Sequence, residues 1–373
     1  VWTKLLGTIE IEYAWGATSS ADGFIYITGS TLGHLDGHTN NGDKDAFLTK
    51  FSADGTKIWT RLFGTNQWDV GTALTTSADG SIYLGGWTRG DLDGQTNNGR
   101  NDAFLSKYNS NGTKVWTKLI GTNGSDAGES LTTGADGSIY FAGWTSGDLD
   151  EENNNKDNTS SDIDVRNWDA FLTKYSSDGS RVWTRLLGTE EADSGTALTT
   201  GADGSIYIAG YTEGDLDGQI NSGGVDAFIS KFNADGTKDW TRLLGTSGWD
   251  EAHALTTGAD GSIYIAGSTN RDLDGQTNNG YQSADAFISK FNPDGTKNWT
   301  RLLGTWVFDE ARALTTGLDG SIYVAGRASG DLDGQTNSGG YGDAFISKFN
   351  PDGTKEWTRL LGSSDWDEAR ALT

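Results

Sequence analysis

The sequence contains no cysteine and no methionine, and among its 373 residues only two are proline and three are histidine. The absence of cysteine excludes disulfides, thiolate nucleophiles and thiolate metal sites, so oxygen ligands are the metal-binding groups present in quantity. No window approaches about 18 consecutive apolar residues, so we expect no membrane-spanning segment. The sequence shows neither an initiator methionine nor a signal peptide, and it starts inside a repeat, so we expect a mature or trimmed piece.

Basic residues are also scarce relative to acidic ones. The chain has 28 Lys and Arg against 52 Asp and Glu, which gives a formal net charge of −24. Because this charge repels phosphate backbones and anionic lipids, we expect no nucleic-acid partner and no insertion into a membrane. The charge is compatible with bound cations, with cationic partners, or simply with solubility.

A single marker, WT[KR]L, recurs along the whole chain. Its tryptophans are Trp2, Trp59, Trp116, Trp183, Trp240, Trp299 and Trp357. The same four apolar segments return between successive markers, so the chain is read as one domain, 1–373, of stacked repeats. The repeats run approximately over 9–65, 66–122, 123–189, 190–246, 247–305 and 306–363, with 1–8 and 364–373 left over.

Each apolar segment has the composition of a strand, rich in Ile, Tyr, Phe, Thr and Trp, as in SIYIAG and DAFISKF. Asp-Gly turns separate the first strand from the second and the third from the fourth, which makes each repeat a four-stranded antiparallel blade. Such a sheet cannot bury both faces alone, so the blades must stack radially. We therefore predict an all-β propeller with almost no helix. Seven blades, the last shared by the two chain ends, is the preferred count and six is the alternative.

The unit ALTTGADGSIYIAG followed by DAFISKFNADGTKDWTRLLGT resembles the SBBP family of β-propeller repeats, found in bacterial surface or secreted proteins. The resemblance covers essentially the whole chain and implies the propeller fold and an extracellular or cell-surface location. It supplies no established activity and no catalytic residues. The first unit departs from the pattern at YAWGATSS, and the third carries a long acidic insertion.

The connection between the second and third strands varies in length while its acids recur. From the Asp of LD to the Asp of DAF the gaps are 9, 9, 19, 9, 11 and 10 residues, so this loop lies on the surface. Alternate oxygen-bearing side chains, as in DLDGQTNNGRND, are spaced to converge on one hard cation, and calcium is the predicted cofactor. The candidate ligands are Asp36, Asn40, Asp45, Asp91, Asp93, Gln95, Asn97, Asp102, Asp148, Asp150, Asn154, Asp169, Asp215, Asp217, Asn221, Asp226, Asp272, Asp274, Asn278, Asp285, Asp331, Asp333, Asn337 and Asp343.

An interpretation without metal remains open for these loops. Asp, Asn and Gly are the residues that tight turns use, because their side chains satisfy nearby backbone groups. A second recurring acid precedes the first strand of each repeat, where a turn is favoured over a metal ligand. Three residues further on, the occupant changes freely, as in Thr72, Glu129, His253 and Arg312, which indicates a position facing solvent or the channel.

Additional aromatic residues are expected on the same face as the long loops. They are Trp68, Trp87, Trp144, Tyr211, Trp249, Trp306 and Trp366. The function that these features predict is a non-enzymatic binding or scaffold propeller whose long-loop face binds a protein or a glycan. A lectin, or a structural subunit that self-assembles through the incomplete blade, is the alternative; a polysaccharide-active enzyme is less favoured, because no nucleophile stands beside an oriented base.

Overall fold

A computed structural model describes residues 2–149, 168–280 and 283–373. The described part contains strands and turns, as the composition predicts, and no helix in it is long and apolar enough to cross a membrane. The chain divides into two compact units, residues 1–187 with 373 and residues 188–372. Asp150 and Asn154, two of the predicted calcium ligands, lie outside the described residues.

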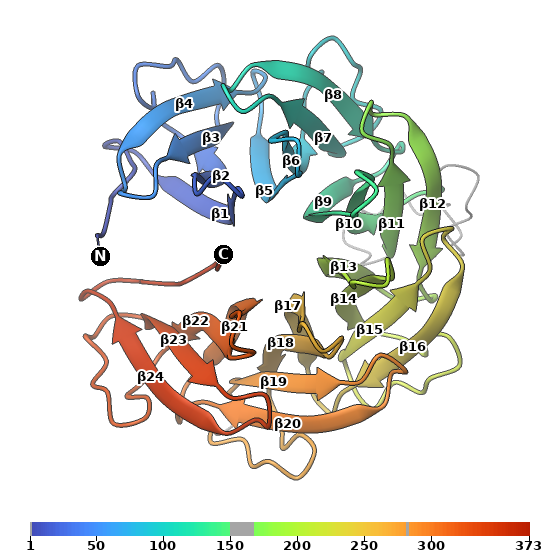
Figure 1. The fold of residues 1–373 in the computed structure, drawn as a ribbon, viewed down its shortest axis with the longest axis vertical. Helices are drawn as coiled ribbons and strands as arrows, with labels where there is room; N and C mark the ends of the chain where they lie inside the picture. The colour runs from blue at the N-terminus through green and yellow to red at the C-terminus, as the bar shows by residue number, and fades with distance from the viewer. Residues whose placement is uncertain (1, 150–167, 281–282) are drawn as a thin grey trace. The chain divides into compact units, whose positions relative to one another are not determined.

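The first unit contains three four-stranded antiparallel blades, each ordered as in the sequence (Figure 1). The first blade is β1 (Glu12–Ser19), β2 (Ile25–Thr31), β3 (Asp45–Phe51) and β4 (Lys57–Phe63). The second blade is β5 (Asp69–Thr76), β6 (Ile82–Thr88), β7 (Asp102–Tyr108) and β8 (Lys114–Ile120). The third blade is β9 (Asp126–Thr133), β10 (Ile139–Thr145), β11 (Asp169–Tyr175) and β12 (Arg181–Leu187).

The second unit repeats this arrangement. Its first blade is β13 (Asp193–Thr200), β14 (Ile206–Thr212), β15 (Asp226–Phe232) and β16 (Lys238–Leu244). Its second is β17 (Asp250–Thr257), β18 (Ile263–Thr269), β19 (Asp285–Phe291) and β20 (Lys297–Leu303). Its third is β21 (Asp309–Thr316), β22 (Ile322–Ala328), β23 (Asp343–Phe349) and β24 (Lys355–Leu361).

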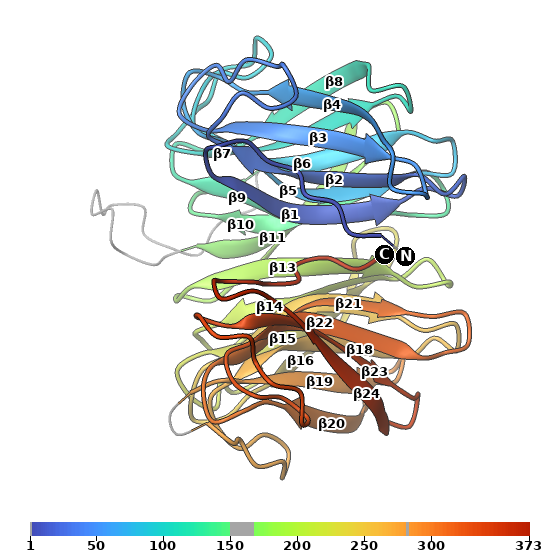
Figure 2. The same ribbon diagram turned by 90° about the vertical axis from the view of Figure 1, so that its left-hand side faces the viewer.

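The first strand of each blade, here called the inner strand, contacts the inner strand of the next blade in the same unit. Each blade is a meander, and Figure 2 shows β1, β2 and β3 running side by side in the first one. Each blade has two tight turns whose glycines have positive φ, as in the second blade, with 81° at Gly80 and 81° at Gly112. Only glycine adopts this region without strain, which explains why Asp-Gly or Asn-Gly recurs at these turns.

The repeated tryptophans pack between blades. The Trp299 ring on β20 lies 6.1 Å from the Tyr264 ring of its own blade, and its Nε1 donates a 3.2 Å hydrogen bond to the Pro351 carbonyl of the next. A methyl group on the turn glycine Gly353 would lie 2.9 Å from the Trp299 ring. Since Trp59, Trp116 and Trp240 meet Gly112, Gly179 and Gly295 in the same way, an aromatic ring rests on a bare glycine at each of these junctions.

The prediction of a seventh blade shared by the two ends is wrong: the described residues form six blades, the alternative count. Residues 2–8 and 364–373 form no strand. A shared blade would have lacked its two middle strands, so its first and last strands would have had nothing between them to pair with. The C-terminal segment bonds instead to the sixth blade, where Asp367 N donates to Gly342 O at 2.9 Å and Ala369 N to Gly326 O at 3.2 Å.

Candidate ligand-binding surface

The loop between the second and third strands is anchored by a Leu-Asp-Gly sequence. In the second blade Leu92 is buried, while Asp93 and Gly94 take positive φ values of 52° and 77°. This backbone turns the Asp93 carboxylate toward the outer strand β8, where it pairs with Lys114 and accepts a hydrogen bond from Thr117. The equivalent ion pairs are Asp36–Lys57, Asp217–Lys238, Asp274–Lys297 and Asp333–Lys355.

The other polar side chains of the loop bond to backbone groups. Asp91 Oδ1 accepts the Asn97 N–H at 2.9 Å, and Asn97 Nδ2 donates to Thr88 O at 3.0 Å. Gln95 Nε2 donates to the Thr117 carbonyl at 2.5 Å. In the first blade His34 Nδ1 accepts the equivalent backbone N–H, so an imidazole replaces a carboxylate in this role.

These contacts bear on the predicted calcium sites. The carboxylates of one loop point to different donors, and nowhere in 2–149, 168–280 or 283–373 do three His, Asp or Glu side chains gather in a group that could hold a metal. Each hydrogen bond is one that a loop without metal would need. The calcium assignment therefore stays a prediction, and the interpretation as structural turns accounts for the contacts.

Where two blades of the same unit meet, the aspartate that closes the long loop is buried beside a second aspartate from the next blade. Asp45, at the start of β3, and Asp69, at the start of β5, are both fully buried. A methyl group on Gly64 would lie 2.5 Å from Asp45 Oδ1 and 2.9 Å from Asp69 Oδ2, so both carboxylates crowd the same glycine. Burial first, and then the neighbouring Asp69 charge, raises the pKa of Asp45 to about 6.

Equivalent pairs recur at other junctions within the units. Burial raises the pKa of Asp285 to about 6 and, followed in effect by the Asp285 charge, raises that of Asp309 to about 6. Asp285 Oδ1, like Asp45 Oδ1, is buried and makes no hydrogen bond to any described residue. These carboxyls thus hold protons at pH values where exposed aspartates are ionised.

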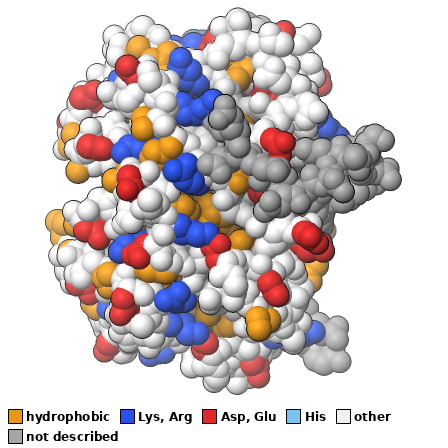
Figure 3. Space-filling model, turned by 90° about the vertical axis from the view of Figure 1, so that its right-hand side faces the viewer, with side chains coloured by type: hydrophobic (Ala, Val, Ile, Leu, Met, Phe, Trp, Pro, Cys, Tyr) orange, Lys and Arg blue, Asp and Glu red, His pale blue; other side chains and the backbone are white. Residues whose placement is uncertain are grey.

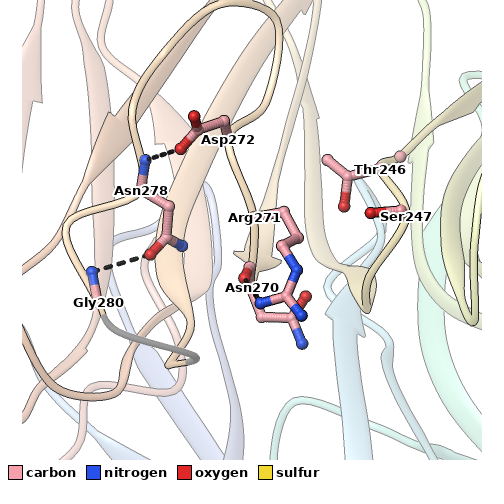
Figure 4. Close-up of a pocket in the computed structure, with 8 residues that line it drawn as sticks. Thr246, Ser247, Asn270, Arg271, Asp272, Asn278 and Gly280 are labelled. Atoms are coloured by element: carbon pink, nitrogen blue, oxygen red, sulfur yellow. Dashed lines mark hydrogen bonds between the residues drawn. The ribbon is translucent and has the colours of Figure 1, made fainter.

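A pocket of about 520 Å³ opens at the long-loop edge of the second unit (Figure 4). Thr246 and Ser247, from the loop before β17, face Asp272 and Asn278, from the loop after β18, with Arg271 between them. An equivalent pocket of about 420 Å³ in the first unit is lined by Thr65, Asn66, Gln67, Arg89, Gly90, Asp91, Asn97 and Gly99.

An exposed tryptophan contacts one lining residue of each pocket, although neither indole lines the pocket itself. Trp249 is 50% exposed, and its backbone N–H donates a 2.8 Å hydrogen bond to Oδ1 of Asn270, a pocket residue. Trp68 is 37% exposed, but the guanidinium of the pocket residue Arg89 lies 4.6 Å from its ring centre and Lys44 lies 4.7 Å away.

The remaining predicted aromatic residues differ in exposure. Trp306 and Trp366 are exposed, and the Arg327 guanidinium lies 4.6 Å from the Trp366 ring centre. Trp87, Trp144 and Tyr211 are half-buried on β6, β10 and β14. Exposed and cation-capped rings are therefore both present among the residues predicted to form a ligand surface.

The freely varying position of each inner strand coincides with a β-bulge. The strand register shifts between Gly71 and Ala73 in β5 and between Ala311 and Ala313 in β21. Thr72 and Arg312 therefore have no partner residue on the neighbouring strand. Bulges re-aim side chains and recur beside functional sites. In the second unit, Arg312 at the β21 bulge and Arg370 at the matching place of the C-terminal segment form an ion-pair network with Glu310 and Glu368, each two positions earlier. No periodic sequence signal marks this network, because glutamate occurs at that position only in the last repeats.

The acidic excess does not form one continuous patch on the face shown in Figure 3, where Lys and Arg side chains are interspersed with Asp and Glu.

Comparisons with known proteins agree with this fold. Residues 182–217 match the SBBP model, described as a beta-propeller repeat, and residues 201–241 match a beta-propeller domain of unknown function, DUF5122. The predicted resemblance to a β-propeller repeat family is thereby confirmed.

Two curated proteins are similar over part of the chain. The regulatory protein FlaEY of Caulobacter vibrioides is 32% identical over 260 residues, which are 62% of this chain and 26% of FlaEY. An uncharacterized WD repeat-containing protein of Acanthamoeba polyphaga mimivirus is 22% identical over 330 residues, 68% of this chain and 24% of that protein. This chain thus spans about a quarter of the length of the curated relatives it matches.

Among solved structures, a catalytically inactive virginiamycin B lyase from Staphylococcus aureus with quinupristin aligns with a TM-score of 0.52. The alignment covers 95% of this chain and 86% of the lyase at 14% identity, which shows a shared fold alone.

Proposed function

We propose that the chain is a non-enzymatic binding propeller that binds carbohydrate on its long-loop face. The observation that carries this proposal is the pocket beside Trp249 in the second unit. Its volume of about 520 Å³ falls within the range of small-molecule sites. An exposed indole offers an apolar face to a sugar ring, and neighbouring polar groups offer hydrogen bonds to its hydroxyls.

The polar groups of this pocket are held in place by the fold. Asn278 N donates to Asp272 Oδ1 at 2.9 Å, and Asn278 Nδ2 donates to Thr269 O at 2.9 Å. Arg271 Nη1 donates to the Asn270 carbonyl at 3.2 Å. Because these side chains are ordered before a ligand arrives, binding costs less conformational entropy.

The pocket beside Trp68 should bind more weakly. Arg89 and Lys44 stand over the Trp68 ring, so a sugar would have to displace at least one cation from it. The proposal includes an extracellular or cell-surface location, which the resemblance to SBBP proteins supports.

An oligosaccharide array probed with labelled wild-type protein and three variants tests this function. We expect W249A and R271A to reduce the signal at least tenfold for the sugars bound by wild type. L318A is the matched control, because Leu318 is also exposed but lies in the Asp-Gly turn between β21 and β22. If wild type binds no sugar, or if W249A binds as well as L318A, the proposal is wrong.

A further inference from the structure

In the second unit, basic side chains occupy one repeated position, which in β13 is a threonine. His253 on β17 and Arg312 on β21 are the residues at the β-bulges, and Arg370 holds the corresponding place in the segment 367–372. The equivalent residue of β13 is Thr196, whose hydroxyl donates to the Ala252 carbonyl at 2.7 Å. A blade can thus be built without charge at this position, so the basic residues are not required by the fold.

Two of these residues, both arginines, are brought together by one carboxylate. Glu368 Oε1 lies 3.2 Å from Arg312 Nε, and Glu368 Oε2 lies 2.5 Å from Arg370 Nη2. A second carboxylate, Glu310, lies 2.7 Å from Arg312 Nη2 and 3.6 Å from Arg327 Nη2. The guanidiniums of Arg312 and Arg370 therefore lie close to each other in spite of their like charge.

In this cluster the carboxylates are buried and the guanidiniums are partly exposed. The side chains of Glu310 and Glu368 are only 4% and 5% exposed, whereas those of Arg312 and Arg370 are 32% and 26% exposed. Burial, followed by the charges of Arg312 and Arg370, lowers the pKa of the neighbouring His253 well below its usual range. Solvent thus meets two guanidiniums beside a neutral imidazole, with the partly exposed Glu251 carboxylate 3.8 Å from His253 Nε2, on a chain whose net charge is −24.

We propose that Arg312 and Arg370 together bind an oxyanion group of a ligand, a carboxylate, sulfate or phosphate. A guanidinium has five N–H donors, more than the contacts to the two glutamates use, and its planar fork matches an oxyanion. Two forks held side by side by Glu368 can share one such group. This site is separate from the pocket beside Trp249 and does not depend on the proposed sugar binding.

Titration calorimetry with inorganic phosphate, sulfate and acetate, at constant ionic strength set by chloride, tests the site. We expect saturable binding of at least one of the three by wild type, and the arms separate carboxylate from phosphate or sulfate. R312Q/R370Q should weaken that binding at least tenfold. R301Q is the control, because Arg301 lies on the outer strand with its guanidinium 5.4 Å from the Trp299 ring centre.

A second variant tests the site even if R312Q/R370Q fails to fold. R312K/R370K keeps both charges next to the buried glutamates but lacks the planar forks, so we expect a folded protein whose anion affinity falls at least fivefold. Circular dichroism checks each variant at the titration temperature. No saturable binding by wild type, or equal binding by wild type and the folded lysine variant, would overturn the proposal.

Discussion

At the scale of single residues, the buried aspartates are the unusual feature. A carboxylate that is buried without full hydrogen bonding costs free energy in its charged form, so the folded protein favours the protonated form. Asp45, Asp126, Asp285 and Asp309 all have a pKa raised by burial to about 6. Their unfolded-state value is near 3.8, so the stabilising contribution is complete below about pH 4 and is lost as pH rises through 6.

We therefore expect the melting temperature to rise as the pH is lowered from 7.5 to 5. Each such carboxyl contributes on the order of 1 kcal/mol between these two pH values. D45N, which is neutral throughout, should show a smaller gain between these two pH values. Asp54 has its pKa lowered to about 2 by hydrogen bonds from Ser52 and Thr56, so stability should fall again in strong acid. A melting temperature that falls between pH 7.5 and 5 would contradict the assignment.

The inter-blade tryptophans provide a second test at this scale. W299A removes the contact with Tyr264, the hydrogen bond to Pro351 and the ring that covers Gly353. We expect a loss of about 3 kcal/mol in the free energy of unfolding, measured in urea. W306A, which truncates a side chain that is 76% exposed, should change it by less than about 0.5 kcal/mol.

At the scale of elements, the Leu-Asp-Gly loop links the second strand of a blade to the fourth through the ion pair of its aspartate. Its aspartate combines an uncommon backbone conformation with an ion pair, two effects of opposite sign. Positive φ costs a non-glycine residue free energy, whereas the contacts with Lys114 and Thr117 in the second blade offset that cost.

Substitution of Asp93 separates these effects. D93A and D93G lose the same contacts, but glycine takes the φ of 52° without strain and alanine does not. We expect D93A to be less stable than D93G by about 1 kcal/mol, measured by thermal unfolding. Equal stability of the two variants would show that the loop relaxes around this residue.

The strands and turns of the blade could be predicted because their signals are local and repeat six times. The directions of the loop side chains could not, because spacing along the chain does not say whether a carboxylate turns toward a cation or, as Asp93 does, toward a lysine on the same blade. The partners of Glu310 and Glu368 were likewise missed, since Arg327 contacts Glu310 from the adjacent strand β22 and Glu368 contacts Arg312 from the C-terminal segment, which forms no strand.

At the scale of the whole molecule, the described part of the chain contains six blades, each a copy of one meander. Its stability is therefore a sum over similar blades and the junctions between them. Substitution of one loop affects one blade, whereas a condition that acts on every loop affects all six. Chelation is such a condition, because the predicted calcium ligands recur in every repeat.

The contacts described above give the loop carboxylates partners within the protein. Because the loop carboxylates are already bonded within the protein, removal of a metal should cost little stability. We therefore expect EDTA to shift the wild-type melting temperature by less than about 2 °C. Elemental analysis of the purified protein is the accompanying measurement. A larger loss of stability together with co-purified calcium would support the calcium sites predicted from the sequence.

The rings of Trp59, Trp116, Trp240 and Trp299 each rest on a glycine of the blade that follows in the chain. During synthesis the N-terminal blades leave the ribosome first. Trp299 therefore has no glycine to cover until Gly353 has been translated, and its indole stays open in the interval. Each newly synthesised blade therefore exposes a tryptophan until the next blade has folded against it. The rate of translation sets how long that tryptophan can bind a chaperone or form a non-native contact.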